Sequence, residues 1–215
     1  MADDGACPRC GKMPPLCVCA EVVPIQNRIR LVILQHPQEQ DVDLGTARLT
    51  ALHFRNAAVR IGLSWPSLSK ALGLKPGEQA DPKRWAVLYL GSARPATFPP
   101  GRTVVALDKK GEPAADQEQA LKYLQGVIVL DGTWAQVKTL WWRNPWLLKV
   151  RRIALNPARP SRYGQLRREA RREALSSLEA AALVMSTLEN NPAIAETLHH
   201  SFDRLLTAFR SRART

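Results

Sequence analysis

Four cysteines near the N-terminus are the residues whose spacing most directly indicates chemistry. They follow the pattern Cys-x-x-Cys and then Cys-x-Cys, at Cys7, Cys10, Cys17 and Cys19, and no cysteine follows Cys19. Four thiolates this close together match a tetrahedral zinc site, which is structural because it has no open coordination position. Two disulfides and an iron–sulfur cluster are the alternatives, although a Cys-x-Cys pair closes a poor disulfide ring and the spacing is unusual for a cluster.

We expect residues 1–24 to form a zinc-binding segment and residues 25–215 to form the main domain. A segment this short cannot build its own core, so metal binding should supply its folding energy. The first seven residues lack the apolar region of a secretory signal. No apolar run approaches the roughly 18 to 20 residues that span a bilayer. We therefore expect a cytoplasmic protein that does not enter a membrane.

A second candidate site is the acid Asp131, which directly follows the apolar run at residues 127–130. In α/β proteins, ligands bind outside the carboxyl ends of the strands, where such an acid would lie. Gly132 permits a tight turn, and Thr133-x-x-Gln136 fits the capping box of a helix. Two interpretations stay open: Asp131 does chemistry in a site, or Asp131 and Thr133 only cap the helix.

Basic residues make up the third chemical feature. The chain has 31 Lys and Arg against 19 Asp and Glu, a formal net charge of +12. Residues 143–172 contain nine Arg and one Lys but a single acid, Glu169. The guanidinium group matches phosphate and carboxylate, so we interpret this stretch as a binding surface for nucleic acid or another anion. A solvated helix face is the alternative. Arg210, Arg212 and Arg214 form a smaller basic patch.

Several familiar catalytic and nucleotide-binding motifs are absent from the sequence. It contains no Gly-x-Gly-x-x-Gly loop, no P-loop, no Gly-x-Ser-x-Gly nucleophile elbow and no His-Glu-x-x-His zinc motif. The chain is therefore neither a common dinucleotide-binding enzyme nor a P-loop NTPase, and it lacks the signatures of α/β-hydrolases and zinc proteases.

The elements that position these residues alternate between strand and helix. Strands are expected at residues 28–34, 85–90, 103–107, 127–130 and 150–155, and helices at 45–55, 116–125, 133–143, 175–188 and from Asn191-Pro192 onward. Continuously apolar strands alternating with helices predict an α/β fold, with a mostly parallel sheet and helices on both faces. Most tryptophans near residues 134–146 belong to the core, but Trp142 lies about 100° around the helix from Trp141 and could face a ligand.

An ordered set of motifs along nearly the whole chain resembles the DTW domain family, the tRNA-uridine aminocarboxypropyltransferases. The family takes its name from Asp-x-Thr-Trp, which is Asp131 to Trp134 here. The other matching blocks are the cysteine pattern, His36-Pro37-Gln38-Glu39, Gly45-Thr46-Ala47-Arg48, Leu88-Tyr89-Leu90-Gly91, Leu166-Arg167-Arg168-Glu169 and Ser176-Ser177-Leu178-Glu179-Ala180.

Two positions depart from the family pattern. Ser177 stands where the family usually has Thr, and Gly45 stands where relatives often have Asn. A second Ser-Thr-Leu-Glu string occurs at residues 186–189, but the block that begins at Ser176 has the better distance from Arg167.

The resemblance implies a SPOUT-like α/β fold with a C-terminal trefoil knot, S-adenosylmethionine as donor and tRNA as partner. Nothing in the sequence indicates an obligate protein partner. The residues implied to bind the donor are Gly91, Ser92, Leu130, Asp131, Thr133, Trp134, Ser177 and Leu178. Those implied to bind substrate or phosphate are His36, Arg48, Arg167 and Arg168.

The implied reaction transfers the 3-amino-3-carboxypropyl group to N3 of a uridine and releases methylthioadenosine. Asp131 is the expected general base. A carboxylate with an ordinary pKa near about 4 is a weak base for this proton, so we expect either a pKa raised by burial or a positional role. Arg167 or Arg168 is expected to bind the donor's carboxylate or else tRNA phosphate. His36 is equally explained as a satisfied strand-end residue, and Ser176 with Glu179 as a capping box.

Two other functions fit the same residues. One is a SPOUT-type RNA methyltransferase, which would use the same donor but transfer a methyl group. The other is a zinc-bearing RNA-binding protein without catalytic activity, which the specific acid at Asp131 disfavours.

Overall fold

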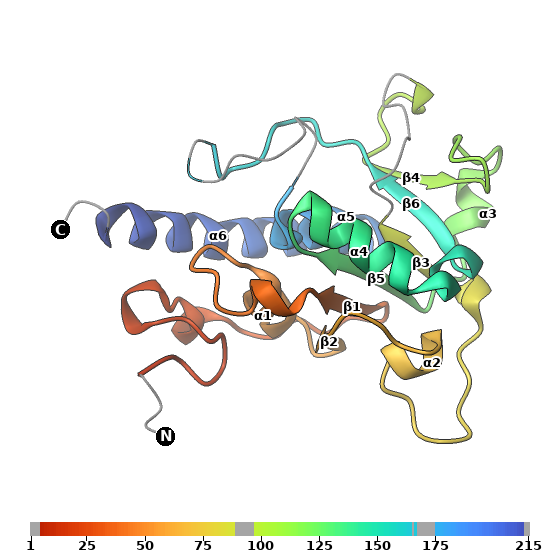
Figure 1. Cartoon of the computed structure of the whole chain (residues 1–215). Helices are drawn as coiled ribbons and strands as arrows, with labels where there is room; N and C mark the ends of the chain where they lie inside the picture. The colour runs from red at the N-terminus through yellow and green to blue at the C-terminus, as the bar shows by residue number, and fades with distance from the viewer. Residues whose placement is uncertain (1–4, 89–96, 165, 167–174, 213–215) are drawn as a thin grey trace.

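In the computed structural model of the protein, six strands form one central sheet with helices packed around it (Figure 1). The structure describes residues 5–88, 97–164, 166 and 175–212. The strands are β1 (Arg30–Gln35), β2 (Ala57–Ile61), β3 (Trp85–Leu88), β4 (Val104–Leu107), β5 (Gly126–Asp131) and β6 (Arg151–Leu155). Their order across the sheet is β2-β1-β5-β3-β6-β4.

The sheet is parallel except at one edge. β1, β2, β3, β5 and β6 pair in parallel, and only β4 runs antiparallel, against β6. The carboxyl ends of the parallel strands therefore meet at one edge of the sheet. β5 lies between β1 and β3, and all six of its residues are buried. The predicted α/β architecture with a mostly parallel sheet is confirmed.

Helices cover both faces of the sheet. α1 (Ala47–Leu52), α5 (Ser177–Leu188) and α6 (Ala193–Arg212) share one apolar core with alternate strand residues, among them Ile33 and Val129. α2 (Leu68–Ala71) and α4 (Trp134–Arg143) share a second core with the intervening residues, among them Leu34 and Leu130. Successive side chains of a strand point to opposite faces, so continuously apolar strands need cover on both sides.

The remaining helical elements are short. α3 (Gln117–Leu121) precedes β5, and single turns of 3-10 helix lie at η1 (Pro14–Leu16), η2 (Cys19–Glu21), η3 (Pro37–Glu39), η4 (Pro82–Arg84) and η6 (Pro145–Lys149). No helix among the described residues is both long and apolar enough to cross a bilayer.

Two expected helices are shorter in the structure, and one strand was not expected. The helix expected at 116–125 ends at Leu121, because Gln125 joins the sheet by donating its backbone N–H to the carbonyl of Arg84. The helix expected at 45–55 ends at Leu52, because Phe54 forms a bridge with Ile25. β2 was not predicted: it is a short edge strand with four half-buried residues and an exposed Ile61, so its apolar pattern is weak.

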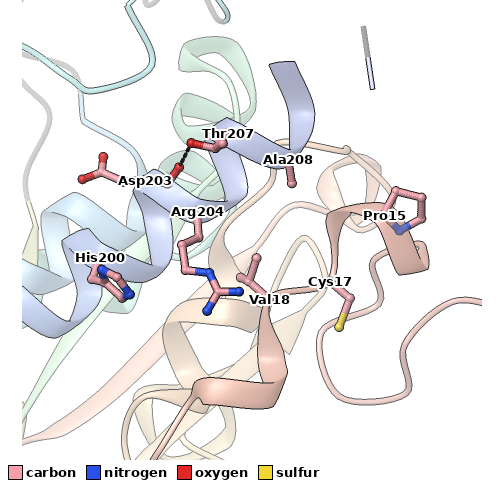
Figure 2. Close-up of a pocket in the computed structure, with 8 residues that line it drawn as sticks. All are labelled: Pro15, Cys17, Val18, His200, Asp203, Arg204, Thr207 and Ala208. Carbon is pink, nitrogen blue, oxygen red and sulfur yellow. Dashed lines mark hydrogen bonds between the residues drawn. The ribbon is translucent and has the colours of Figure 1, made fainter. Parts of the chain in front are cut away.

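The cysteine segment packs against the end of α6. Leu16, Val18 and Val22 belong to the same core as α5 and α6. An open groove of about 430 Å³ lies between the two segments (Figure 2). Its lining includes Cys17 and Val18 from the cysteine segment and His200 and Arg204 from α6. Arg204 forms an ion pair with Glu21, and Arg212 forms one of 2.9 Å with Asp43. Of the basic patch expected at the chain end, Arg212 therefore forms an ion pair with an acid of the loop before α1.

Two expectations fall on residues beyond the described ranges. The strand expected at 85–90 is described to Leu88. The expected C-terminal trefoil knot stays a prediction, since residues 167–174 lie outside the described ranges.

Candidate functional site

Asp131 is the last residue of β5 and its carboxylate is held at both oxygens. Gln35, the last residue of β1, donates from Nε2 to Oδ2 of Asp131 across 2.9 Å. Ser177 donates its hydroxyl to Oδ1 of the same carboxylate. Asp131 is 8% exposed, and Gln35 is 2% exposed. The acid predicted from the sequence therefore lies at the carboxyl edge of the sheet with a fixed orientation.

The first turn of α5 brings Ser177 to this acid. Ser176 is the N-cap residue, and its side chain accepts from the backbone N–H of Glu179, whose carboxylate accepts in return from the backbone N–H of Ser176. This capping box fixes where the helix begins. Ser177 then occupies the first helical position. The positive end of the helix dipole lies there and favours the ionised carboxylate of Asp131.

α4 begins directly beyond Asp131. Thr133 caps it, and Thr133 and Gln136 form a second capping box. A Cβ at Gly132 would lie 2.9 Å from Cβ of Gln136 and 3.4 Å from Cβ of His36, so the turn requires a residue without a side chain. The capping interpretation is thus confirmed for Thr133, whereas the Asp131 carboxylate bonds to Gln35 and Ser177.

His36 and Thr46 link two further segments to the site. The backbone N–H of His36 donates to the carbonyl of Asp131 over 2.9 Å, and its Nδ1 accepts from the backbone N–H of Gln38. Thr46, the N-cap residue of α1, accepts from the backbone N–H of Leu178 through Oγ1. The starts of α1, α4 and α5 are therefore connected around the end of β5.

A buried lysine of the cysteine segment and an arginine of α1 lie in the same region. Lys12 is 8% exposed, and its ammonium group donates to the carbonyl of Val42 over 2.7 Å. Burial lowers the pKa of Lys12, and the negative charges of Cys10, Asp43 and Asp131 oppose this. Arg48 on α1 lies against the same segment. A Cβ at Gly11, whose φ is +71°, would lie 2.6 Å from Nη1 of Arg48.

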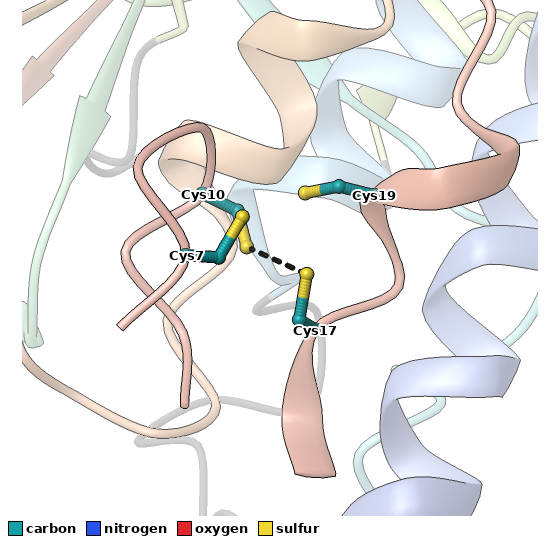
Figure 3. A group of neighbouring side chains, drawn as sticks. All are labelled: Cys7, Cys10, Cys17 and Cys19. Atoms are coloured by element: carbon teal, nitrogen blue, oxygen red, sulfur yellow. Dashed lines mark hydrogen bonds between the residues drawn. The ribbon is translucent and has the colours of Figure 1, made fainter. Parts of the chain in front are cut away.

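The four cysteines converge in space (Figure 3). Their sulfur atoms all lie within 4.8 Å of one another, and all four are free thiols, so the disulfide alternative is not realised. Cys10 Sγ and Cys17 Sγ are 3.8 Å apart. Tetrahedral zinc with Zn–S bonds of about 2.3 Å requires sulfur atoms roughly 3.8 Å apart. The donor set and its geometry therefore fit a zinc ion.

The thiols differ in acidity. The pKa of Cys7 is lowered to about 6, mainly because its sulfur accepts a hydrogen bond from the backbone N–H of Cys10. Burial instead raises the pKa of Cys10 and of Cys19. A bound cation would stabilise all four as thiolates.

The remaining predicted site residues divide into two groups. Leu130 and Leu178 are buried in the two cores, and Trp134 is half-buried in the first turn of α4. Gly91, Ser92, Arg167 and Arg168 lie outside the described residues. Gln35 and Lys12 were not predicted as site residues from the sequence. The signal for Gln35 was a polar residue at the carboxyl end of a continuously apolar run.

Several arginines of the basic stretch have structural contacts. Arg162 forms an ion pair of 2.7 Å with Asp203, and Arg152 lies over the ring of Trp141 at 5.8 Å from its centroid. Arg151 donates to the carbonyl of Lys83. At least these three arginines of the basic stretch therefore have structural contacts.

Comparison with known proteins gives one consistent result. Residues 5–210 match the DTW domain. The chain is 27% identical over 198 residues to tRNA-uridine aminocarboxypropyltransferase 2 of Macaca fascicularis and 28% identical over 200 residues to that of Mus musculus. Each alignment covers 89% of this chain and 59% of the relative, so the chain spans less than two thirds of these relatives' length.

A third relative and the solved structures complete the comparison. The protein of the same name in Drosophila melanogaster is 27% identical over 196 residues, which cover 89% of this chain and 70% of the relative. No solved structure matches the chain. Since the DTW domain covers nearly the whole sequence, from the cysteine cluster to the last turns of α6, this chain belongs to the DTW domain family.

Proposed function

We propose that this chain transfers the 3-amino-3-carboxypropyl group of S-adenosylmethionine to N3 of a tRNA uridine. The observation that carries the proposal is the position of Asp131. It is a buried carboxylate at the carboxyl end of β5, in the Asp-x-Thr-Trp block that gives the family its name. The names of the relatives support tRNA uridine as the acceptor and the aminocarboxypropyl group as the group transferred.

In the proposed reaction, N3 of uridine attacks the methylene carbon next to the sulfonium of the donor. The new N–C bond forms as the C–S bond breaks, and the sulfur keeps the electron pair and leaves as methylthioadenosine. The proton of N3 must go to a base, because the neutral imide is a poor nucleophile. Asp131 is the acid that we assign to this role.

The hydrogen bonds of Asp131 suit a group that orients the acceptor and takes its proton. Gln35 and Ser177 each donate to one oxygen, which favours the ionised form and fixes the plane of the carboxylate. Each oxygen of an ionised carboxylate has two lone-pair sites, so it can accept more than one hydrogen bond. The carboxylate is therefore preorganised to accept a hydrogen bond from N3–H before transfer.

The other assignments follow the family motifs. Leu130, Thr133, Trp134, Ser177 and Leu178, together with Gly91 and Ser92, are proposed to bind the donor. His36, Arg48, Arg167 and Arg168 are proposed to contact tRNA or the donor's carboxylate. If Arg167 or Arg168 contacts phosphate, its removal should flatten the salt dependence of tRNA binding. If it contacts the donor's carboxylate, removal should raise the donor KM and leave that dependence unchanged.

Zinc is proposed to be structural, held by Cys7, Cys10, Cys17 and Cys19. Four thiolates leave no coordination position for substrate, so the metal would stabilise the segment that carries Lys12 and packs on α6. We further propose that residues 1–24 form this zinc segment, that residues 25–215 form the catalytic domain with a SPOUT-like knot, and that the protein acts in the cytoplasm.

The test is mass spectrometry of nucleosides from unmodified tRNA incubated with the protein and S-adenosylmethionine. We expect a uridine heavier by one 3-amino-3-carboxypropyl group, formed in equal amount with methylthioadenosine. A methylated nucleoside with S-adenosylhomocysteine would instead identify a methyltransferase. If tRNA binds but neither product forms, the protein is an RNA-binding protein without this activity.

A further inference from the structure

Trp142 is a large apolar side chain that the fold leaves in solvent. It lies in the last turn of α4 and is 78% exposed, more than any other large apolar residue in the described part of the chain. Its neighbour Trp141 is half-buried, and Arg152 lies over its ring. Packing and cation–π contacts thus account for Trp141, whereas neither accounts for Trp142.

Two basic residues lie close to Trp142 in the sequence. Lys138 lies one helical turn before it on the same face of α4, where side chains four residues apart are neighbours. Arg143 follows it directly, and both cations are exposed. Within the described ranges neither forms an ion pair. From Gly132 to Arg168 the sequence contains no Asp or Glu, so no nearby acid in this stretch neutralises them.

The helix that carries this surface begins at the candidate site. Thr133 caps α4 two residues after Asp131, and Trp142 is nine positions after Thr133. At 1.5 Å per residue, Trp142 lies about 14 Å along the helix axis from the cap. A ligand that reaches Asp131 and is longer than a nucleotide can therefore extend along α4 to Trp142.

We infer that Lys138, Trp142 and Arg143 form a stacking platform for an unpaired nucleobase of the tRNA substrate, with the two cations against the adjoining phosphates. The inference rests on the proposed function, because it takes tRNA as the ligand. Exposed aromatic rings beside cations are how proteins hold unpaired bases without reading their sequence, since every base has a face that can stack. The platform would contribute affinity and leave the chemistry at Asp131 unchanged.

The chain provides a matched control at Tyr123. This residue is also an exposed aromatic beside a lysine, with the ammonium of Lys122 at 5.4 Å from its ring centroid. It lies between α3 and β5, at the amino end of β5, whereas Asp131 lies at the carboxyl end. Tyr123 therefore has the local chemistry of Trp142 but lies outside α4, at the other end of β5 from Asp131.

The test is a titration of fluorescently labelled tRNA with the full chain at several salt concentrations, read by anisotropy. We expect Trp142→Ala to raise Kd by roughly 5- to 100-fold, the range for one lost stacked base, without changing the salt dependence. Trp142→Phe should recover most of the affinity. Lys138→Gln should reduce the slope of log Kd against log salt by about 0.7 to 0.9. Tyr123→Ala should bind as the unaltered protein does.

The outcomes separate this inference from the proposed function. If the unaltered chain binds and modifies tRNA but Trp142→Ala binds equally well, the platform is wrong and the proposed function stands. If the unaltered chain does not bind tRNA, both are wrong. Sedimentation of the same proteins checks a third outcome: a dimer that Trp142→Ala dissociates would show that this surface joins two copies of the chain. Trp142 is exposed, so the variant should keep the unfolding temperature of the unaltered protein.

Discussion

Gln35 and Asp131 are direct partners in the parallel ladder between β1 and β5, and their side chains are joined by a hydrogen bond of 2.9 Å. Each is the last residue of its strand. The bond therefore depends on the register of the two central strands, since a shift of one residue would turn Gln35 to the opposite face of the sheet. The orientation of the candidate base is set by the same pairing that builds the sheet.

Replacement of Gln35 by Leu should impair turnover by removing one donor to Asp131. We expect kcat to fall roughly 10- to 100-fold with little change in the KM for tRNA, because Gln35 positions the carboxylate and has no assigned contact with RNA. Loss of a donor to the ionised form should also move the acidic limb of the kcat–pH profile to higher pH. Steady-state kinetics from pH 5 to 9 measure both effects.

Stability provides the control for this variant. Among the described residues, Gln35 Oε1 is buried without a hydrogen-bond partner, so Leu removes an unsatisfied polar atom as well as a donor. The unfolding temperature should change little. A variant with unaltered kcat and an unaltered pH profile would contradict a positioning role for Gln35.

Asp131→Asn should abolish most of the activity and preserve the structure. Asn can still accept from Ser177 but cannot take the proton of uridine N3, so turnover should drop by several orders of magnitude while zinc content and tRNA affinity persist. Asp116→Asn is the control, because Asp116 is an acid that only caps α3. Near-normal transfer by Asp131→Asn, measured by nucleoside mass spectrometry, would remove Asp131 from the mechanism.

The position of Asp131 was predictable because it depends on local signals. A continuously apolar run marks a buried strand, and the residues after it in an α/β fold lie at the ligand-binding edge. The capping pattern at Thr133 fixed the start of α4 in the same local way. Contacts between distant segments were not predictable: the bond between Gln35 and Asp131 joins residues 96 apart and depends on strand order.

The late Ser-rich block illustrates the same limit. Two similar strings, at Ser176 and Ser186, were candidates, and only their spacing decided between them. In the structure Ser177 reaches Asp131, whereas Ser186 and Thr187 bond back to the carbonyl of Leu183 within α5. The position of Arg48 also depends on a contact between distant segments. Its place against Gly11 follows from how the cysteine segment folds back, which no local pattern indicates.

Acidification should destabilise the fold through His53. Burial lowers the pKa of His53 to about 4 from its ordinary value of 6.5, and neither ring nitrogen has a hydrogen-bond partner in the described structure. Below pH 6.5 the unfolded chain binds a proton that the folded chain excludes until about pH 4. The free energy of unfolding should therefore fall across this window as pH falls, by up to roughly 3 kcal/mol.

The measurement for His53 is urea unfolding at several pH values between 4 and 7. His53→Phe removes the titrating group, so its free energy of unfolding should depend less steeply on pH in this window. The same slope in both proteins would show that other groups cause the acid sensitivity.

Loss of one cysteine should remove the metal and loosen the N-terminal segment. We expect the unaltered protein to bind one zinc per chain and Cys10→Ser to bind it far more weakly, with a lower unfolding temperature, because metal binding contributes folding free energy. Metal analysis and thermal unfolding test this. Met13→Ala, an exposed change in the same segment, should keep the metal. Full zinc occupancy in Cys10→Ser would contradict the four-cysteine assignment.

Glu179→Ala should destabilise the protein strongly. The buried carboxylate of Glu179 accepts from the hydroxyl of Ser161, the backbone N–H of Arg162, and both the backbone N–H and hydroxyl of Ser176. Its loss leaves buried donors unpaired, so we expect the free energy of unfolding to fall by about 2 to 4 kcal/mol. Glu196→Ala, an exposed change in the first turn of α6, should be nearly neutral in the same urea titration.

The residues joined around the end of β5 come from widely separated parts of the chain, and this has a consequence for biosynthesis. Gln35 and Thr46 are translated early, but their partners Asp131 and Leu178 follow 96 and 132 residues later. Ser177, which also donates to Asp131, is translated 46 residues after it. A nascent chain still lacking α5 would lack the hydrogen bond from Ser177, so the candidate site is completed near the end of synthesis.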